Sequence, residues 1–198
     1  MPEVVEAIRA GKPVILPTDT VYGLCATPYR AEATERLYRL KGREATQPTA
    51  IVARDLAFLL ECVPELRGPA ATVLGALLPG PYTVVVPNPA RRYRWLTGDR
   101  PETIGVRVPS MPEEAAWVLE RVGAIVATSA NLAGGPDPRR LEDVPEEIRS
   151  RVAAVVDAGE LPGTPSTVLD VTGDEPVVLR EGAVPAAEAL ARVREALA

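Results

Sequence analysis

The octet KGREATQP, residues 41–48, concentrates side chains that can hold a charged ligand. It contains Lys41, one of only two lysines among 22 basic residues, and Gln47, the only glutamine of the chain. Where lysine and glutamine are so rare, a specific role for the few that remain is favoured. Together with Arg43, they supply cationic and amide donors for phosphate or carboxylate oxygens. Alternatively, Lys41 and Arg43 end a helix and only complement its dipole.

A second segment, ATSANLAGGPDP at residues 127–138, runs from an apolar strand into small, hydrogen-bonding and glycine-rich chain. Ser129 and Asn131 can bond a phosphate or the edge of a base. Their small neighbours let backbone N–H groups approach an anion. A plain polar turn would have the same composition.

Arg107 interrupts the apolar strand TIGVRVP, residues 103–109. A charged side chain within such a strand needs a partner, because an unpaired buried charge is costly. The partner is either a structural carboxylate or a ligand anion. We favour the ligand, since a guanidinium binds planar carboxylates and phosphates through paired hydrogen bonds. Ser166 and Arg180 lie near the ends of two further strands and are weak signals by themselves.

The segment LPTDTVYGL, residues 16–24, follows a strand and gathers three hydroxyls and a carboxylate, from Thr18, Thr20, Tyr22 and Asp19. Sheets in α/β proteins commonly bind ligands at such strand ends. A polar turn that satisfies its own backbone groups explains the same residues equally well. Both interpretations therefore stay open.

Missing residue types argue against several reaction classes. The chain has no histidine, so neither Ser nor Cys has an imidazole base. It also lacks the GxxxxGK[ST] nucleotide loop and a strand-borne GxGxxG. Cys25 and Cys62 are too few for a disulfide framework, and no zinc site is expected. If the protein is an enzyme, we expect it to act by positioning and charge stabilisation of its reactants.

Composition points to one globular domain over residues 1–198, with 46% hydrophobic and 25% charged residues. The net charge of -5 argues against a general nucleic-acid coat but not against a local basic site. We see no signal pattern and no apolar run of membrane-spanning length, so we expect a cytoplasmic protein without a membrane partner.

Strand and helix patterns alternate along the chain and predict an α/β domain with a mixed sheet covered by helices. Residues 88–102 are expected to form a mobile surface loop. Helices are predicted at 3–10, 31–40, from Asp55 onward, 69–78, 112–122, 139–152 and 186–197. Strands are predicted at 13–18, 49–53, 82–87, 103–109, 123–130 and 153–159, with a hairpin formed by STVLDV and PVVLR around TGDE.

Taken together, these stretches resemble the YrdC-like family, whose active members are threonylcarbamoyl-AMP synthases. The matching motifs occur in the family's order over most of the chain: PTDTVYGL, KGR, LLPGPYTVVV, TIGVRVP, TSAN, STVLD and VVLREG. The resemblance implies a twisted mixed sheet flanked by helices, with a large concave basic cavity. It also implies a nucleotidyltransferase that forms threonylcarbamoyl-AMP and pyrophosphate from L-threonine, bicarbonate and ATP. That product serves the t6A37 modification of tRNA, which a partner transferase complex completes.

The resemblance assigns roles position by position. L-threonine would be held by Thr20, Arg107 and Ser166. ATP would be held by Lys41, Arg43, Gln47, Thr103, Ala127, Ser129, Asn131, Asp137 and Arg180. Mg²⁺ would accompany the triphosphate, no permanently bound metal is implied, and no side chain is assigned a catalytic role. These assignments require residues 41–48 and 127–131 to fold against each other, with Asn131 facing Lys41 across the cavity.

Two positions depart from the family pattern. Many members carry Asn where Gln47 stands, and many carry a threonine-contacting His that this comparison places at Ala53. The segment around Ala53 is closer to the YciO-type branch, although the Ser129-x-Asn131 pair is intact. Three functions stay open: the synthase, a non-catalytic binder of nucleotide or double-stranded RNA, and an enzyme of the same fold that uses another amino acid or carbamoyl donor.

Overall fold

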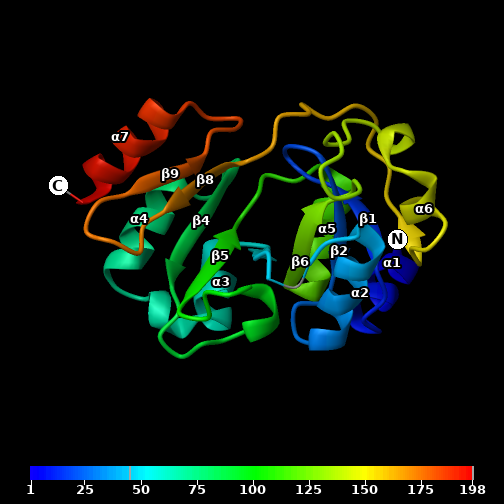
Figure 1. The fold of residues 1–198 in the computed structure, drawn as a ribbon, viewed down its shortest axis with the longest axis horizontal. Coiled ribbons are helices and arrows are strands. Elements are labelled where there is room, and N and C mark those ends of the chain that lie inside the picture. The colour runs from blue at the N-terminus through cyan, green and yellow to red at the C-terminus, as the bar shows by residue number, and fades with distance from the viewer. Residues whose placement is uncertain (45, 198) are drawn as a thin grey trace.

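The computed structural model describes residues 1–44 and 46–197, and nine strands within these ranges form one mixed sheet (Figure 1). The order across the sheet is β7-β1-β2-β6-β3-β5-β4-β8-β9. The pairs β1–β7, β3–β5 and β4–β8 are parallel, and the other neighbours are antiparallel. The strands are Val14–Pro17 (β1), Tyr22–Ala26 (β2), Ala50–Ala53 (β3), Tyr82–Pro87 (β4), Thr103–Arg107 (β5), Ala124–Ser129 (β6), Ala154–Val155 (β7), Thr167–Asp170 (β8) and Val177–Arg180 (β9). The predicted mixed α/β fold is confirmed.

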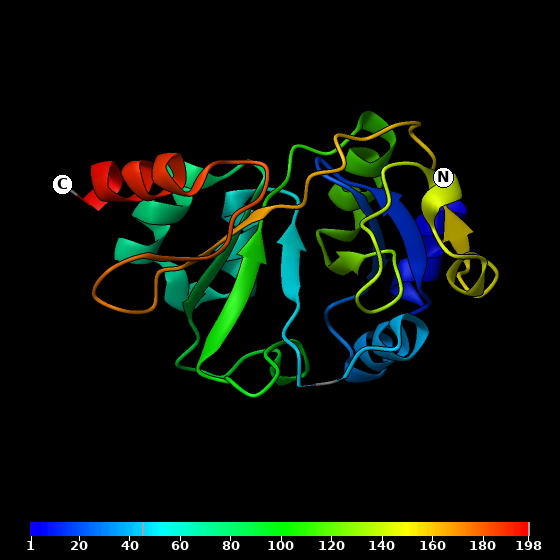
Figure 2. The same ribbon diagram turned by 45° about the horizontal axis from the view of Figure 1, so that its top comes forward.

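Helices gather at both ends of this sheet. Figures 1 and 2 both place α4 and α7 at one end and α1, α2 and α6 at the other. The helices are Pro2–Arg9 (α1), Ala31–Lys41 (α2), Leu56–Cys62 (α3), Pro69–Leu77 (α4), Glu113–Val122 (α5), Glu146–Arg149 (α6) and Ala186–Leu197 (α7). None of those in the described ranges has both the length and the apolar character that a membrane crossing needs.

The period-two alternation of the strands divides the core between the two faces of the sheet. Val14 and Leu16 of β1 belong to the smaller apolar cluster, together with residues of α1 and α5. Ile15 between them points to the opposite face and belongs to the larger cluster, which includes residues of α2, α3, α4 and α7. The sheet is therefore covered on both faces over much of its area.

Local signals explain where several helices begin and end. Asp55 precedes α3 as its N-cap, and its Oδ1 accepts a hydrogen bond from the backbone N–H of Phe58 at 2.6 Å. Gly42 ends α2 with φ of 65°, a left-handed conformation that costs glycine little. The same turn carries Lys41 and Arg43, so the end of α2 positions both cations.

The prediction of one helix over residues 139–152 is wrong. The structure has a 3-10 turn at Leu141–Asp143 and a single α-helical turn, α6. Pro145 lies between them and disfavours a continuous helix, because it lacks an N–H and restricts the preceding residue. The strand predicted at 153–159 is likewise reduced to Ala154–Val155, paired with β1.

Residues 88–102 are more strongly anchored than the predicted mobile surface loop. Asn88 is fully buried, and its amide donates to the carbonyl oxygens of Arg92 at 2.9 Å and Pro101 at 3.1 Å. Its Oδ1 accepts from the backbone N–H of Arg92 at 2.9 Å. The segment also contains a 3-10 turn, Arg94–Leu96. The Asn88 side chain thus links the start of the loop to its middle at Arg92 and to its end at Pro101.

The sequence did not predict β2. Its residues Tyr22–Ala26 are all buried, and they pair with β1 on one side and β6 on the other. The polar residues just before it suggested a turn. Residues 18–21 do form that turn, and β2 begins at Tyr22. The predicted hairpin of STVLDV and PVVLR is confirmed by the antiparallel pairing of β8 and β9.

Candidate functional site

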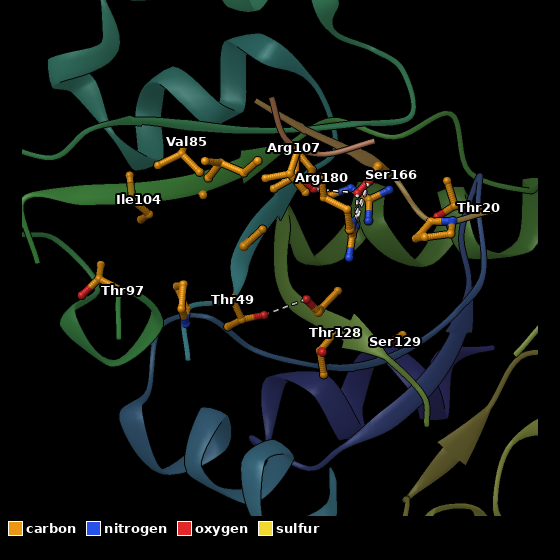
Figure 3. Close-up of a pocket in the computed structure, with 18 of the residues that line it drawn as sticks. Thr20, Thr49, Val85, Thr97, Ile104, Arg107, Thr128, Ser129, Ser166 and Arg180 are labelled. Carbon is orange, nitrogen blue, oxygen red and sulfur yellow. Dashed lines mark hydrogen bonds between the residues drawn. The ribbon is translucent and has the colours of Figure 1, made fainter. Parts of the chain in front are cut away.

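A cavity of about 300 Å³ lies where the ends of several strands meet (Figure 3). Arg107, Arg180 and Ser166 gather on one side of it, while Thr49, Thr128 and Ser129 lie on the other. Its charged lining groups are four arginines and one aspartate: Arg43, Arg100, Arg107, Arg180 and Asp137. Cationic groups therefore dominate the lining of a protein whose net charge is negative, and an anionic small molecule is the ligand that suits them.

Strand alternation places these polar groups. In β5, Ile104 and Val106 belong to the large apolar core, whereas Arg107 points to the other face. Val52 of β3 is in register with Arg107 and packs in the cluster with α5. Arg107 thus emerges on the face that α1 and α5 cover further along the sheet, and β4 contributes Thr83 to the same wall.

The Arg107 guanidinium is paired with a carboxylate of the protein itself. Its Nη2 donates to Oδ1 of Asp19 at 2.9 Å, and the side chains are only 12% and 9% exposed. This corrects our expectation that a ligand anion alone would satisfy Arg107. Burial raises the pKa of the Asp19 carboxyl above its ordinary value, and the positive charge of Arg107 offsets this only in part. Burial also lowers the pKa of Arg107.

Ser166 links the wall strands to a second arginine. Its Oγ lies 2.8 Å from Oγ1 of Thr83, and its carbonyl oxygen accepts from Nη2 of Arg180 at 2.8 Å. Sequence reasoning missed Thr83, although it is a polar residue at an alternate position of a strand whose other face is apolar. That pattern was a usable signal.

The predicted contact between residues 41–48 and residues 127–131 is confirmed. The Lys41 ammonium donates to the carbonyl oxygen of Ser129 at 2.7 Å, lies 3.1 Å from both Ser129 Oγ and the carbonyl oxygen of Asn131, and contacts Oδ1 of Asn131. An ammonium has three protons, so these four acceptors share them. Burial, reinforced by the nearby charge of Arg43, lowers the pKa of Lys41 to about 8.

Lys41 and Asn131 lie side by side rather than across the cavity from each other. Both are buried, at 6% exposure, and neither belongs to the cavity lining, whereas Ser129 does. Asn131 also donates to the carbonyl oxygen of Gly135 at 2.6 Å. This cluster fixes the chain that follows β6 and so sets the direction of the Ser129 hydroxyl.

Arg43 reaches the cavity from the end of α2. Its Nη1 donates to Oγ1 of Thr128 at 3.0 Å, and its guanidinium carbon lies 5.8 Å from the centre of the Tyr38 ring. Gln47, by contrast, is exposed and does not line the cavity. Among the described residues of the octet, Arg43 and Pro48 are the ones that contribute to the lining.

Two residues singled out from the sequence lie outside the cavity. Tyr22 is fully buried, and its hydroxyl reaches Oδ1 of Asp157 at 2.6 Å and the carbonyl oxygen of Gly159 at 2.7 Å. Ala53 packs into the large apolar core, on the face of β3 opposite Val52. A side chain at Ala53 therefore points away from Arg107, and Val52 is the β3 residue beside that arginine.

The structure brings most of the predicted site residues together. Nine line the one cavity: Thr20, Arg43, Thr103, Arg107, Ala127, Ser129, Asp137, Ser166 and Arg180. Lys41 and Asn131 lie behind Ser129, and Gln47 lies on the surface. Five further polar residues of the lining were not predicted: Thr49, Thr83, Thr97, Arg100 and Thr128.

Fold and cavity together define an α/β protein with an arginine-lined small-molecule site at its strand ends. A sequence model of the Sua5/YciO/YrdC family, described as "Telomere recombination", matches residues 6–182. The chain belongs to this family.

Relatives from both branches of the family are similar to this chain. The threonylcarbamoyl-AMP synthase of Bacillus subtilis is 33% identical over 188 residues, which cover 92% of this chain and 54% of the relative. The crystal structure of Pyrococcus abyssi Sua5 complexed with L-threonine is 35% identical, with a TM-score of 0.84 over 93% of this chain and 54% of the other. Escherichia coli YciO is 30% identical, with a TM-score of 0.81 over 94% of this chain and 90% of the other. The chain thus spans about half the length of these synthases.

Proposed function

We propose that this protein is an L-threonylcarbamoyladenylate synthase, which forms threonylcarbamoyl-AMP and pyrophosphate from L-threonine, bicarbonate and ATP. One observation carries the proposal: nine of the residues that the family resemblance assigns to threonine and ATP line one arginine-rich cavity. Similarity to proteins named threonylcarbamoyl-AMP synthase, and to a Sua5 complexed with L-threonine, supports it.

The threonine end of the site would be the wall around Arg107. Its guanidinium would bind the substrate carboxylate, while the hydroxyls of Thr20 and Ser166 would hold the rest of the amino acid. Arg180 touches the Ser166 backbone and adds a second positive charge near Arg107. An amino acid seated here would have its amine directed toward the remaining cavity.

The ATP end would lie along β6 and the end of α2. Arg43, Thr103, Ala127, Ser129, Asp137 and Arg180 would contact the nucleotide, with Mg²⁺ bound to its phosphates. Lys41 and Asn131 would act on ATP mainly by fixing Ser129, since both are already hydrogen-bonded there. Gln47 would have to move from the surface to reach the nucleotide.

The reaction would proceed without a side-chain nucleophile. The threonine amine adds to bicarbonate with loss of water, and a carbamate oxygen then attacks the α-phosphorus as pyrophosphate leaves. The negative charge that develops on the leaving phosphates would be stabilised by Arg43 and Arg180. The rest of the rate enhancement would come from holding the reactants in a reactive orientation.

The product would serve tRNA. We propose that a t6A transferase complex receives threonylcarbamoyl-AMP for t6A37 modification, and that tRNA or double-stranded RNA is a further ligand. A chemical assay tests the first step directly. Incubation with ATP, Mg²⁺, L-threonine and labelled bicarbonate should give a labelled adenylate, separable by chromatography, and pyrophosphate.

Arg107→Ala should abolish the labelled product, whereas Glu65→Ala should not. Glu65 pairs with Arg92 at 2.8 Å and neither residue lines the cavity. Pyrophosphate release that needs no threonine, or no adenylate from the native protein, would refute the synthase proposal.

A second candidate is a YciO-type binder of nucleotide or double-stranded RNA that lacks threonine-dependent turnover. One observation favours it: Ala53 stands where many family members carry a threonine-contacting His, and the segment around it is closer to the YciO-type branch. RNA affinity that falls steeply with salt, without adenylate formation, would identify this function. An enzyme of the same fold with another amino acid would instead give a thermal shift with that amino acid and ATP.

A further inference from the structure

The Asp19 carboxylate holds Arg107, the arginine at the proposed threonine end of the cavity, through a hydrogen bond. Arg107 is the last residue of β5, and Asp19 lies in the turn between β1 and β2. In the sheet, β2, β6 and β3 separate β1 from β5. The hydrogen bond of 2.9 Å between Arg107 and Asp19 therefore spans the sheet end where the cavity lies.

The turn that carries Asp19 is held tightly by its own side chains. Oγ1 of Thr18 accepts from the backbone N–H groups of Thr20 and Val21, both at 3.2 Å, and donates to the carbonyl oxygen of Val21 at 2.7 Å. Gly163 adds a hydrogen bond from its N–H to the Thr20 carbonyl oxygen at 2.8 Å. Asp19 thus projects from a fixed support.

The ion pair leaves bonding capacity unused. Among the described residues, the buried Nε of Arg107 has no hydrogen-bond partner, and neither has Oδ2 of Asp19. Arg107 lines the cavity, whereas Asp19 does not. Asp19 therefore contacts the guanidinium outside the lining and leaves other N–H groups of that arginine available to a ligand.

Burial makes this support necessary. It is the main cause that disfavours the charged form of Arg107 and lowers its pKa; the nearby Arg180 adds to it, and Asp19 favours the charged form. Without an acceptor on residue 19, Nη2 of Arg107 would lose its hydrogen bond in a poorly solvated wall. The Arg107 side chain would then turn away from its present direction.

We infer that Asp19 is a positioning residue, which orients the Arg107 guanidinium so that its free N–H groups meet the carboxylate of the amino-acid substrate. The inference rests on the proposed function, because that function supplies the carboxylate. It adds to the site a residue that does not touch the ligand. Asp19 is expected to set affinity for the amino acid and not for the nucleotide.

Two substitutions separate orientation from charge. Asp19→Ala removes the acceptor altogether, whereas Asp19→Asn retains an oxygen of similar reach for Nη2 of Arg107. We expect Asp19→Ala to raise the KM for L-threonine about tenfold or more, with the KM for ATP within about twofold of native. Asp19→Asn should recover most of the loss. The matched control, Glu65→Ala, takes the carboxylate from an arginine remote from the cavity and should change neither KM.

A threonine KM unchanged in Asp19→Ala, or equal rises in both KM values, would overturn the positioning role. Titration of the native chain with L-threonine in the presence of ATP identifies the other failure. A native protein that neither binds threonine nor forms the adenylate refutes the proposed function, whatever Asp19 does.

A crystal structure of Asp19→Ala tests the inference without any substrate. The Arg107 guanidinium should leave its native position in that variant and keep it in Asp19→Asn. An unmoved guanidinium in Asp19→Ala would show that Asp19 does not position it, even if the variant binds threonine weakly.

Discussion

The ammonium of Lys41 lies 2.7 Å from the carbonyl oxygen of Ser129, a residue 88 positions further along the chain. This contact joins the end of α2 to the end of β6 in the part of the fold where both reach the cavity. Because Lys41 is buried and forms several hydrogen bonds, it holds the segment from Ser129 to Asn131 in place. The predictions below separate such supporting groups from groups that meet a ligand.

Lys41→Met should destabilise the protein and impair turnover together. The substitution keeps much of the side-chain volume but takes the ammonium donor from the carbonyl oxygens of Ser129 and Asn131, at a cost of about 1–3 kcal/mol. Chemical denaturation measures the stability change, and pyrophosphate release measures turnover. The exposed Lys12, the only other lysine, gives the control Lys12→Met, which should change neither quantity. A Lys41→Met protein of native stability would show that Lys41 does not stabilise the segment from Ser129 to Asn131.

The same lysine should make stability depend on pH. Its pKa is about 8 in the folded protein against 10.5 for the ordinary group. Between these values the unfolded chain binds more protons than the native one, so the free energy of unfolding rises with pH by up to about 1.4 kcal/mol per unit. The gain is complete above pH 10.5 and is lost as the pH falls through about 8. The difference in stability between native protein and Lys41→Met, measured by denaturation from pH 7 to pH 10, should show this slope, and parallel curves would rule it out.

Thr83→Val should weaken threonine binding without unfolding the protein. The two side chains have nearly the same shape, but valine cannot bond Oγ of Ser166, which now lies 2.8 Å from the Thr83 hydroxyl. We expect the KM for L-threonine to rise about three- to tenfold, because a single neutral hydrogen bond contributes about 1 kcal/mol. Steady-state kinetics at saturating ATP measures it.

Thr34→Val is the matched control for Thr83→Val. Thr34 is fully buried, its hydroxyl has no hydrogen-bond partner among the described residues, and it does not line the cavity. Its replacement should leave the KM unchanged. If both variants behave alike, Thr83 has no role in the threonine site.

Tyr22→Phe should cost stability and nothing else. Its hydroxyl bonds Asp157 and the Gly159 carbonyl oxygen, which ties β2 to the chain after β7. Loss of the hydroxyl removes a donor from the Gly159 carbonyl oxygen and the acceptor of the Ala158 N–H, while Asp157 keeps its hydrogen bond from the Gly159 N–H. The free energy of unfolding should fall by about 1–2 kcal/mol. The KM values for L-threonine and ATP should both stay native. A raised KM for L-threonine would instead show that Tyr22 contributes to ligand binding.

Much of the fold follows from local pattern. Amphipathic helices, such as α1 and α7, and apolar strands, such as β4, lie where hydrophobic periodicity predicts them. The prediction failed at α6, where Pro145 divides the segment. It also failed at β2, because the polar residues before this strand suggested a turn although its five residues are buried. At α6 a local proline outweighs the helical periodicity. At β2 the pairing with β1 and β6, which periodicity does not contain, makes a strand of residues that follow a polar turn.

The sequence by itself determined which residue types were available and which faces of the strands they occupy. Rarity singled out Lys41 and Gln47, and its place within an apolar strand singled out Arg107 as a charge that needs a partner. Only the tertiary structure decided their partners. It gave Arg107 the carboxylate of Asp19, turned Lys41 toward Ser129 and left Gln47 on the surface. The physical reason is that a buried charge is stabilised by whichever group long-range sheet pairing brings within about 3 Å, and such pairing joins segments that no local pattern relates.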